Sequence, residues 1–159
     1  MCRELWTTRP TPEVVKENTE FADFWRDVRK NAGLAPQVEL SDLWFISDAL
    51  KIERLVGRKL PDWVDASVFQ HLMEYQDLNF KMMVYNQTLA RLSGGNLLNE
   101  MQNNMKAKLK GHRTKKVYVY SAHDDTVAPL LAALNVYNNL APPYASAVML
   151  ELWETEKKV

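Results

Sequence analysis

Two adjacent acid–base residues, His123 and Asp124, are the strongest candidates for chemistry in this sequence. They follow a short apolar run and open a helical pattern, so we expect them at the carboxyl end of a strand, where ligands of open α/β sheets bind. A helix start also offers free backbone N–H groups to an anion. A protonated imidazole can hold a phosphoryl oxygen, and a protonated Asp can give its proton to a leaving alkoxide. The pair indicates a phosphate site, although the same strand, turn and Asp cap are common as purely structural features.

The other histidines and the glycine pair have simpler interpretations. His71 falls within a helical pattern and His112 in a basic loop, so we expect structural or surface roles for both. Gly94-Gly95 lacks the rest of a phosphate-binding loop and predicts a connector between helices. The basic run from Lys106 to Lys116 predicts the solvated end of a helix, with attraction of phosphate-rich ligands left open.

Helical patterns fill most of the chain before these residues. Apolar spacing and capping residues predict helices over about 12–32, 39–51 and 62–92, with a further helical pattern that ends near residue 110. Alternating or β-branched runs predict strands over 116–122 and 147–154, with a helix between them that begins at Asp124 or Asp125 and carries Pro129 in its first turn. Two strands cannot make a stable sheet alone, so they predict part of a larger α/β sheet.

Composition excludes several classes of protein. The 159 residues carry 20 Lys plus Arg and 20 Asp plus Glu, without the basic excess that is typical of nucleic-acid binders. No apolar run reaches the roughly 18 residues of a membrane span. Cys2 is the single cysteine, so no internal disulfide and no cysteine zinc site can form. Asn86-Gln87-Thr88 is a glycosylation sequon, but its place in a helical pattern lowers its weight.

Longer segments of the chain resemble the histidine acid phosphatases, and the prostatic and lysosomal branch in particular. The resemblance rests on the run from Tyr118 to Ser146 with its His123-Asp124 pair and Pro142-Pro143-Tyr144-Ala145-Ser146 turn, on Leu150-Glu151-Leu152, and on two upstream segments, Gly94–Met101 and Leu60–Trp63. It is specific from about Gly94 onward. It implies an α/β fold, a partial histidine-phosphatase-like sheet with a large helical cap domain.

The resemblance also implies a reaction and roles for two residues. In this family a phosphate monoester is hydrolysed through a phosphohistidine intermediate, and the attacking histidine belongs to an Arg-His-Gly motif. By the motif match, His123 would hold the phosphate and Asp124 would be the catalytic proton donor. No metal or organic cofactor is implied. Phosphomonoester substrates, no nucleic-acid partner, and a lysosomal or secreted location follow from the same resemblance, and a homodimer is left open.

The sequence departs from the family at one important point, because it contains no Arg-His-Gly triplet. We therefore expect residues 1–159 to be a fragment of the phosphatase domain that is inactive alone. Within it, residues 11–110 would be the helical cap and residues 115–159 the C-terminal part of the catalytic core. The family also implies a disulfide partner for Cys2 beyond Val159.

Two other functions compete with the phosphatase prediction. The chain could be a non-catalytic relic that binds phosphate or phospholipid through His123 and the basic run. It could also be a helical protein-interaction module over residues 11–110, whose partner face is the apolar helix between Asp62 and Leu92.

Overall fold

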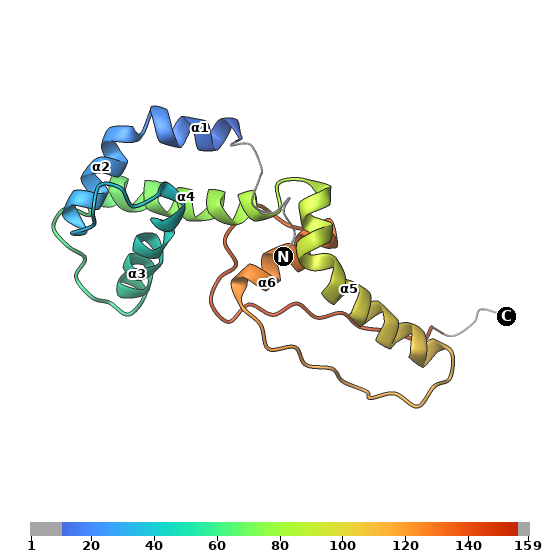
Figure 1. Ribbon diagram of the computed structural model, residues 1–159. Helices are drawn as coiled ribbons and strands as arrows, with labels where there is room; N and C mark the ends of the chain where they lie inside the picture. Colours follow the sequence, from blue (N-terminus) through green and yellow to red (C-terminus); the bar gives the residue numbers. More distant parts are fainter. Residues whose placement is uncertain (1–10, 156–159) are drawn as a thin grey trace. The chain divides into compact units, whose positions relative to one another are not determined.

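A computed structural model describes residues 11–155 as helices joined by turns and irregular segments (Figure 1). The chain divides into two compact units, Met1–Met82 and Met83–Val159. The helices are α1 (Pro12–Thr19), α2 (Ala22–Asn31), the 3-10 helix η2 (Leu40–Asp42), α3 (Trp44–Leu55), α4 (Ala66–Met83), α5 (Gln87–Leu109) and α6 (Asp124–Ala133). Cys2 and its predicted disulfide lie outside the described residues.

The prediction of a partial α/β sheet is wrong for the residues that the structure describes. Residues 116–122 and 147–154 form no strand there, and Figure 1 draws both segments as irregular chain. A strand is held by hydrogen bonds to a neighbouring strand, which an alternating side-chain pattern cannot supply. Val119, Met149 and Trp153 in these segments are accordingly 86%, 82% and 76% exposed.

The predicted helix over 12–32 begins and ends as expected but is broken in the middle. Pro12 is the first residue of α1, and Gly33 (φ +71°) follows α2 in the left-handed conformation that closes many helices. The Leu34 amide donates to the carbonyl of Arg29 at 2.8 Å, which completes this cap. The break lies at Glu20 and Phe21, so the chain forms α1 and α2 instead of one helix.

A buried polar cluster joins α1 and α2 to α4. The Trp25 indole Nε1 donates to Glu17 Oε2 at 2.9 Å, and His71 Nε2 lies 3.1 Å from the same oxygen. The rings of Phe21 and Phe24 lie against the His71 ring, with centroids 4.2 Å and 4.5 Å away. These contacts satisfy a buried carboxylate, as buried charges require, and they support the structural role predicted for His71.

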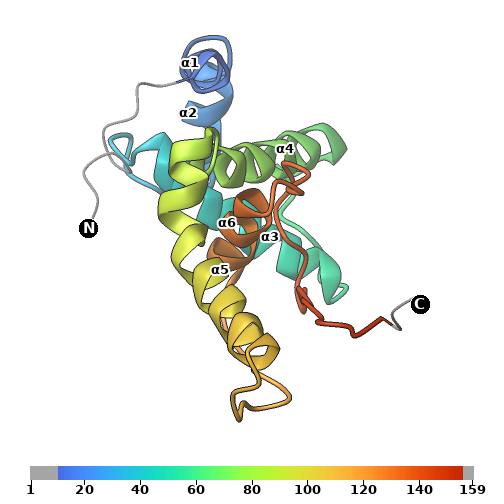
Figure 2. The ribbon, with the colours of Figure 1, turned by 90° about the vertical axis from the view of Figure 1, so that its right-hand side faces the viewer.

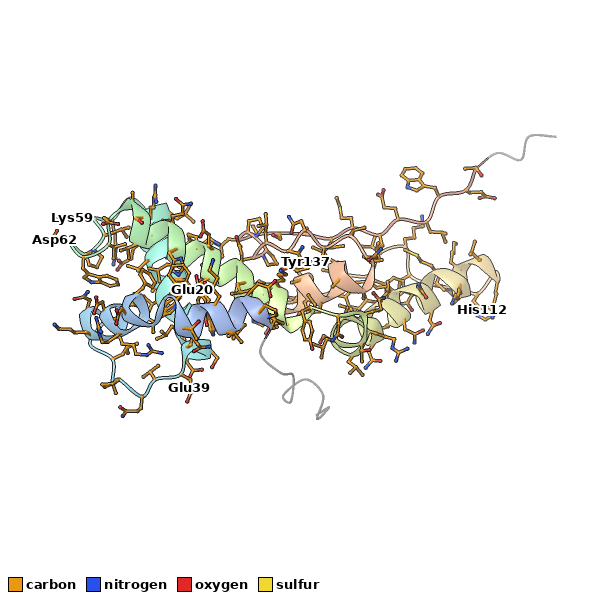
Figure 3. The ribbon with its side chains drawn as sticks, turned by 90° about the horizontal axis from the view of Figure 1, so that it is seen from above. Glu20, Glu39, Lys59, Asp62, His112 and Tyr137 are labelled. Carbon is orange, nitrogen blue, oxygen red and sulfur yellow. The ribbon has the colours of Figure 1, made fainter. Side chains whose placement is uncertain are left out.

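Further contacts hold α4 within the first unit. The Tyr75 hydroxyl donates to the carbonyl of Leu40 at 2.6 Å, and burial raises the pKa of Tyr75 above its ordinary value. At the other end of α4, Lys81 Nζ donates to Glu13 Oε1 at 2.9 Å, and this hydrogen bond is the main reason that the pKa of Glu13 falls to about 2. In the connector between α3 and α4, Lys59 Nζ lies 2.7 Å from Asp62 Oδ1, and Figure 3 shows the two residues side by side. Such an exposed pair contributes little to stability.

The second unit is built on the packing of α5 against α6, which lie side by side in Figures 1 and 2. α5 runs through Gly94 and Gly95, so the predicted connector at this pair is wrong. Gly94 is buried, and a Cβ atom placed there would lie 2.2 Å from the Pro129 carbonyl oxygen. The glycine is therefore needed for close approach of two helices rather than for a turn.

The break between α4 and α5 lies earlier in the chain than predicted. The expected helix over 62–92 is interrupted between Met83 and Gln87. Asn86 is the N-cap of α5, and its side-chain oxygen accepts a hydrogen bond from the Leu89 amide at 2.9 Å.

The predicted functional division, a cap over 11–110 and a core segment over 115–159, is a separate matter and stays a prediction. Among the described residues, no helix combines the length and the apolar character needed to cross a membrane.

Candidate functional site

His123 and Asp124 lie together at the start of α6, as predicted. His123 is the N-cap in extended conformation (φ −118°, ψ 172°), and Asp124 is the first helical residue. The His123 carbonyl accepts hydrogen bonds from the amides of Thr126 and Val127, both at 3.0 Å. The Asp125 amide donates to Asp124 Oδ1 at 2.8 Å, which orients the Asp124 carboxylate beside the helix start.

The electrostatics of this helix start are mixed. The backbone N–H groups of a first turn and the helix dipole favour an anion, whereas Asp124 and Asp125 place two carboxyl groups in the same turn. His123, Asp124 and Asp125 are all exposed. The turn therefore combines a helix dipole that attracts an anion with two carboxyl groups that repel one, and its Asp125, Thr126 and Val127 amides already donate within the turn.

The buried face of α6 fixes where this turn lies in the second unit. Ala128, Pro129 and Leu130 are buried, and Gly94 of α5 lies directly against Pro129. The prediction that Pro129 lies in the first turn of this helix is wrong, because Pro129 is the sixth residue of α6. Proline has no N–H to give to the carbonyl four residues earlier, so α6 is held at this point by packing rather than by its own ladder.

The other predicted site features lie elsewhere. His112 follows the C-terminal end of α5, where its amide donates to the Ala107 carbonyl at 3.1 Å (Figure 3). Lys106 and Lys108 occupy the last turn of α5, which suits the negative end of a helix dipole. Within residues 11–155, no group of three or more His, Cys, Asp and Glu side chains could hold a metal ion.

Sequence reasoning missed one contact next to the site. Asn104 on α5 donates to the Tyr120 hydroxyl at 3.0 Å, and Tyr120 lies three residues before His123. The sequence analysis placed Tyr120 only as a strand residue. No local pattern signals a bond between residues so far apart in sequence, because it depends on how the segment after α5 folds back along that helix.

Comparison with known proteins places these residues in a family. The family described as "Histidine phosphatase superfamily (branch 2)" matches residues 6–159 of this chain. The chain is 36% identical over 152 residues to lysosomal acid phosphatase of Homo sapiens, which covers 94% of this chain and 36% of that protein. It is 36% identical over 150 residues to prostatic acid phosphatase of Homo sapiens, a match that covers 92% of this chain and 39% of that protein. It is 35% identical over 119 residues to putative acid phosphatase 5 of Caenorhabditis elegans, a match that covers 74% of this chain and 28% of that protein.

These relatives are much longer than the chain, which spans 36% of the lysosomal and 39% of the prostatic human enzyme. The match nevertheless includes both units and the whole of α6 with its His123-Asp124 turn. This chain therefore belongs to branch 2 of the histidine phosphatase superfamily.

Proposed function

We propose that this chain contributes to the hydrolysis of phosphate monoesters, with His123 holding the phosphate and Asp124 donating the proton to the leaving group. The observation that carries the proposal is the exposed His123-Asp124 turn at the start of α6, in a chain that belongs to this phosphatase family. The acid phosphatase names of its relatives support the same reaction class.

The two residues would act on different oxygens of the phosphate monoester. Protonated His123 would hydrogen-bond a non-bridging oxygen and stabilise the negative charge that develops on the phosphoryl group. Asp124, in its protonated form, would give its proton to the bridging oxygen as the bond to phosphorus breaks. Because this role needs the protonated carboxylic acid, it suits acidic surroundings.

The attacking group is outside this proposal. Residues 1–159 contain no Arg-His-Gly triplet, the motif to which the attacking histidine of the histidine acid phosphatases belongs. A second candidate function is phosphate binding without hydrolysis, in which His123 keeps its role and Asp124 does not react. One experiment separates the two.

His123→Gln should weaken the binding of inorganic phosphate by about tenfold, because a neutral amide replaces a charged donor to the anion. The measurement is a phosphate titration followed by ³¹P NMR, with hydrolysis of p-nitrophenyl phosphate assayed on the longest natural protein that contains these residues, since residues 1–159 are expected to be inactive alone. His112→Gln is the matched control, since it removes a histidine at the far end of α5.

Each outcome has a distinct meaning. Weaker phosphate binding together with lost hydrolysis supports the phosphatase proposal. Weaker binding in a protein that hydrolyses nothing supports the second candidate. Equal phosphate affinity in both variants contradicts the role of His123 in either function.

The names of the relatives also suggest where the protein acts. We propose a lysosomal or secreted location, in line with the lysosomal and prostatic relatives. A homodimer stays a prediction, and sedimentation of the purified protein would test it.

A further inference from the structure

One helix, α5, contacts the chain on both sides of the His123-Asp124 turn. Before the turn, Asn104 donates to the Tyr120 hydroxyl at 3.0 Å. After the turn, Gly94 lies so close to Pro129 that no side chain fits between them. The two anchor residues on α5 are about ten residues apart, which is roughly 15 Å along a helix. Because both anchors belong to one helix, their separation is fixed.

The Tyr120 anchor is a specific polar contact. Burial raises the pKa of the Tyr120 hydroxyl, and the carboxylate of Glu100 raises it further, while the same hydroxyl oxygen accepts the hydrogen bond from Asn104. Glu100 and Asn104 lie four residues apart on α5 and thus share one face of the helix. Three residues of extended chain from Tyr120 to His123 reach at most about 11 Å. The anchor therefore limits where the imidazole can lie.

We propose that Tyr120 is a positioning residue, whose hydroxyl bond to Asn104 on α5 fixes the turn that presents His123 and Asp124. The proposal rests on the phosphomonoesterase function proposed above. Tyr120 does not touch substrate in this role. It acts by restricting the approach of the imidazole and of the Asp124 carboxyl group, and small displacements of catalytic groups have large effects on rate.

Tyr120→Phe removes the hydroxyl and leaves the ring in place. Tyr118→Phe, two residues earlier, removes the same atom from the same segment and is the matched control. A displaced proton donor matters most when the leaving alkoxide is strongly basic, as in β-glycerophosphate, and least for p-nitrophenyl phosphate, whose phenolate leaves readily unprotonated. In an active enzyme that contains these residues together with the nucleophile, we expect Tyr120→Phe to lower kcat/KM about tenfold for β-glycerophosphate and about twofold for p-nitrophenyl phosphate. A merely structural role would lower both values equally.

Asn104→Leu removes the other partner of the same bond. It should reproduce the leaving-group dependence of Tyr120→Phe, and the double variant should lose about as much as either single one, because both act on one interaction. Additive losses, or equal losses for the two substrates, would overturn the proposal.

A measurement on residues 1–159 that needs no activity separates this proposal from the proposed function. In Tyr120→Phe, the ¹⁵N–{¹H} NOE of the His123 and Asp124 amides should fall, while Tyr118→Phe leaves it unchanged. An unchanged NOE in Tyr120→Phe overturns the anchor, whatever the activity. A lowered NOE keeps the anchor, and the kinetic comparison in the active enzyme then judges the proposed reaction separately.

A second inference comes from the turn between α4 and α5. The structure places the sequon Asn86-Gln87-Thr88 at the start of α5, with all three residues exposed. Asn86 itself has extended backbone (φ −138°, ψ 162°) rather than helical backbone, which removes the reason for giving the sequon little weight. Its side-chain oxygen caps the Leu89 amide, so the amide nitrogen Nδ2 remains outside that hydrogen bond.

We propose that Asn86 carries an N-linked glycan. In this reaction Nδ2 attacks the anomeric carbon of a lipid-pyrophosphate-linked oligosaccharide, the lipid pyrophosphate leaves, and the nitrogen loses one proton. The product keeps its side-chain carbonyl, so the cap to Leu89 survives. The proposal rests on the lysosomal or secreted location proposed above, since the donor is found in the secretory pathway.

Peptide mass spectrometry of the protein purified from its natural source tests the glycan. Treatment with peptide N-glycosidase F should convert Asn86 to Asp in the only Asn-x-Ser/Thr triplet of the sequence. Asn86→Asp keeps an N-cap residue and removes the acceptor, so it should abolish the mass shift without lowering the melting temperature. Unmodified Asn86 in the mature protein overturns the proposal, and a phosphatase assay on the same sample judges the proposed function independently.

Discussion

In an active enzyme that contains these residues together with the nucleophile, Asp124→Asn is expected to lower kcat/KM for β-glycerophosphate by about 10²–10⁴-fold, or roughly 3–5 kcal/mol of transition-state stabilisation. An alkoxide leaving group needs a proton as its bond to phosphorus breaks, and an amide cannot supply one. The same substitution should lower kcat/KM for p-nitrophenyl phosphate by only about tenfold, because that leaving group departs readily as an anion. Initial rates with both substrates, measured at acidic pH, give the comparison.

The local structure makes Asn a conservative replacement. The Asp125 amide donates to Asp124 Oδ1, and the side-chain oxygen of Asn can accept the same bond. Asp125→Asn is the matched control, since it removes a carboxylate from the same turn, where its oxygen accepts from the Thr126 hydroxyl at 3.2 Å. We expect that control to stay within about threefold of the unmodified protein. Equal losses for the two substrates in Asp124→Asn would show that Asp124 does not protonate the leaving group.

The start of α6 could be predicted from the sequence because its signals are local. A polar N-cap, acidic residues in the first turn and apolar spacing after them are all read within a few residues. The structure places His123 and Asp124 at that helix start. Their roles are another matter, because the chemistry rests on groups around the turn. The Asn104–Tyr120 bond joins segments that only tertiary structure brings together.

Two of the failed fold predictions have the same physical cause, because each depends on tertiary contacts that a local sequence pattern does not contain. Alternating side chains over 147–154 predict a strand, but a strand also needs a hydrogen-bonded neighbour, and none is present among the described residues. Gly94-Gly95 predicts a break, whereas the helix continues because Pro129 packs against Gly94. The break at Asn86 is different, because an Asn with an extended backbone is a common helix cap and could have been recognised.

Gly94→Ala should destabilise the packing of α5 on α6 by about 1–3 kcal/mol, although alanine is the better helix former by about 1 kcal/mol. The added Cβ would lie 2.2 Å from the carbonyl oxygen and 2.5 Å from the carbonyl carbon of Pro129. These are backbone atoms, so no side-chain rotation can relieve the clash and the two helices must separate. Amide hydrogen exchange in α6 measures the effect within the second unit, and it should become faster by about tenfold or more.

Gly95→Ala is the matched control on the same helix. Its added Cβ would lie 3.4 Å from Cγ of Arg91, a flexible side chain and an ordinary contact distance. The gain in helix propensity then dominates, so exchange in α6 should stay equal or become slower. Opposite signs at two adjacent glycines would show that the close approach to Pro129 requires Gly94. A stabilising Gly94→Ala would instead mean that α6 does not pack here as described, and the positioning of His123 by α5 would lose its second anchor.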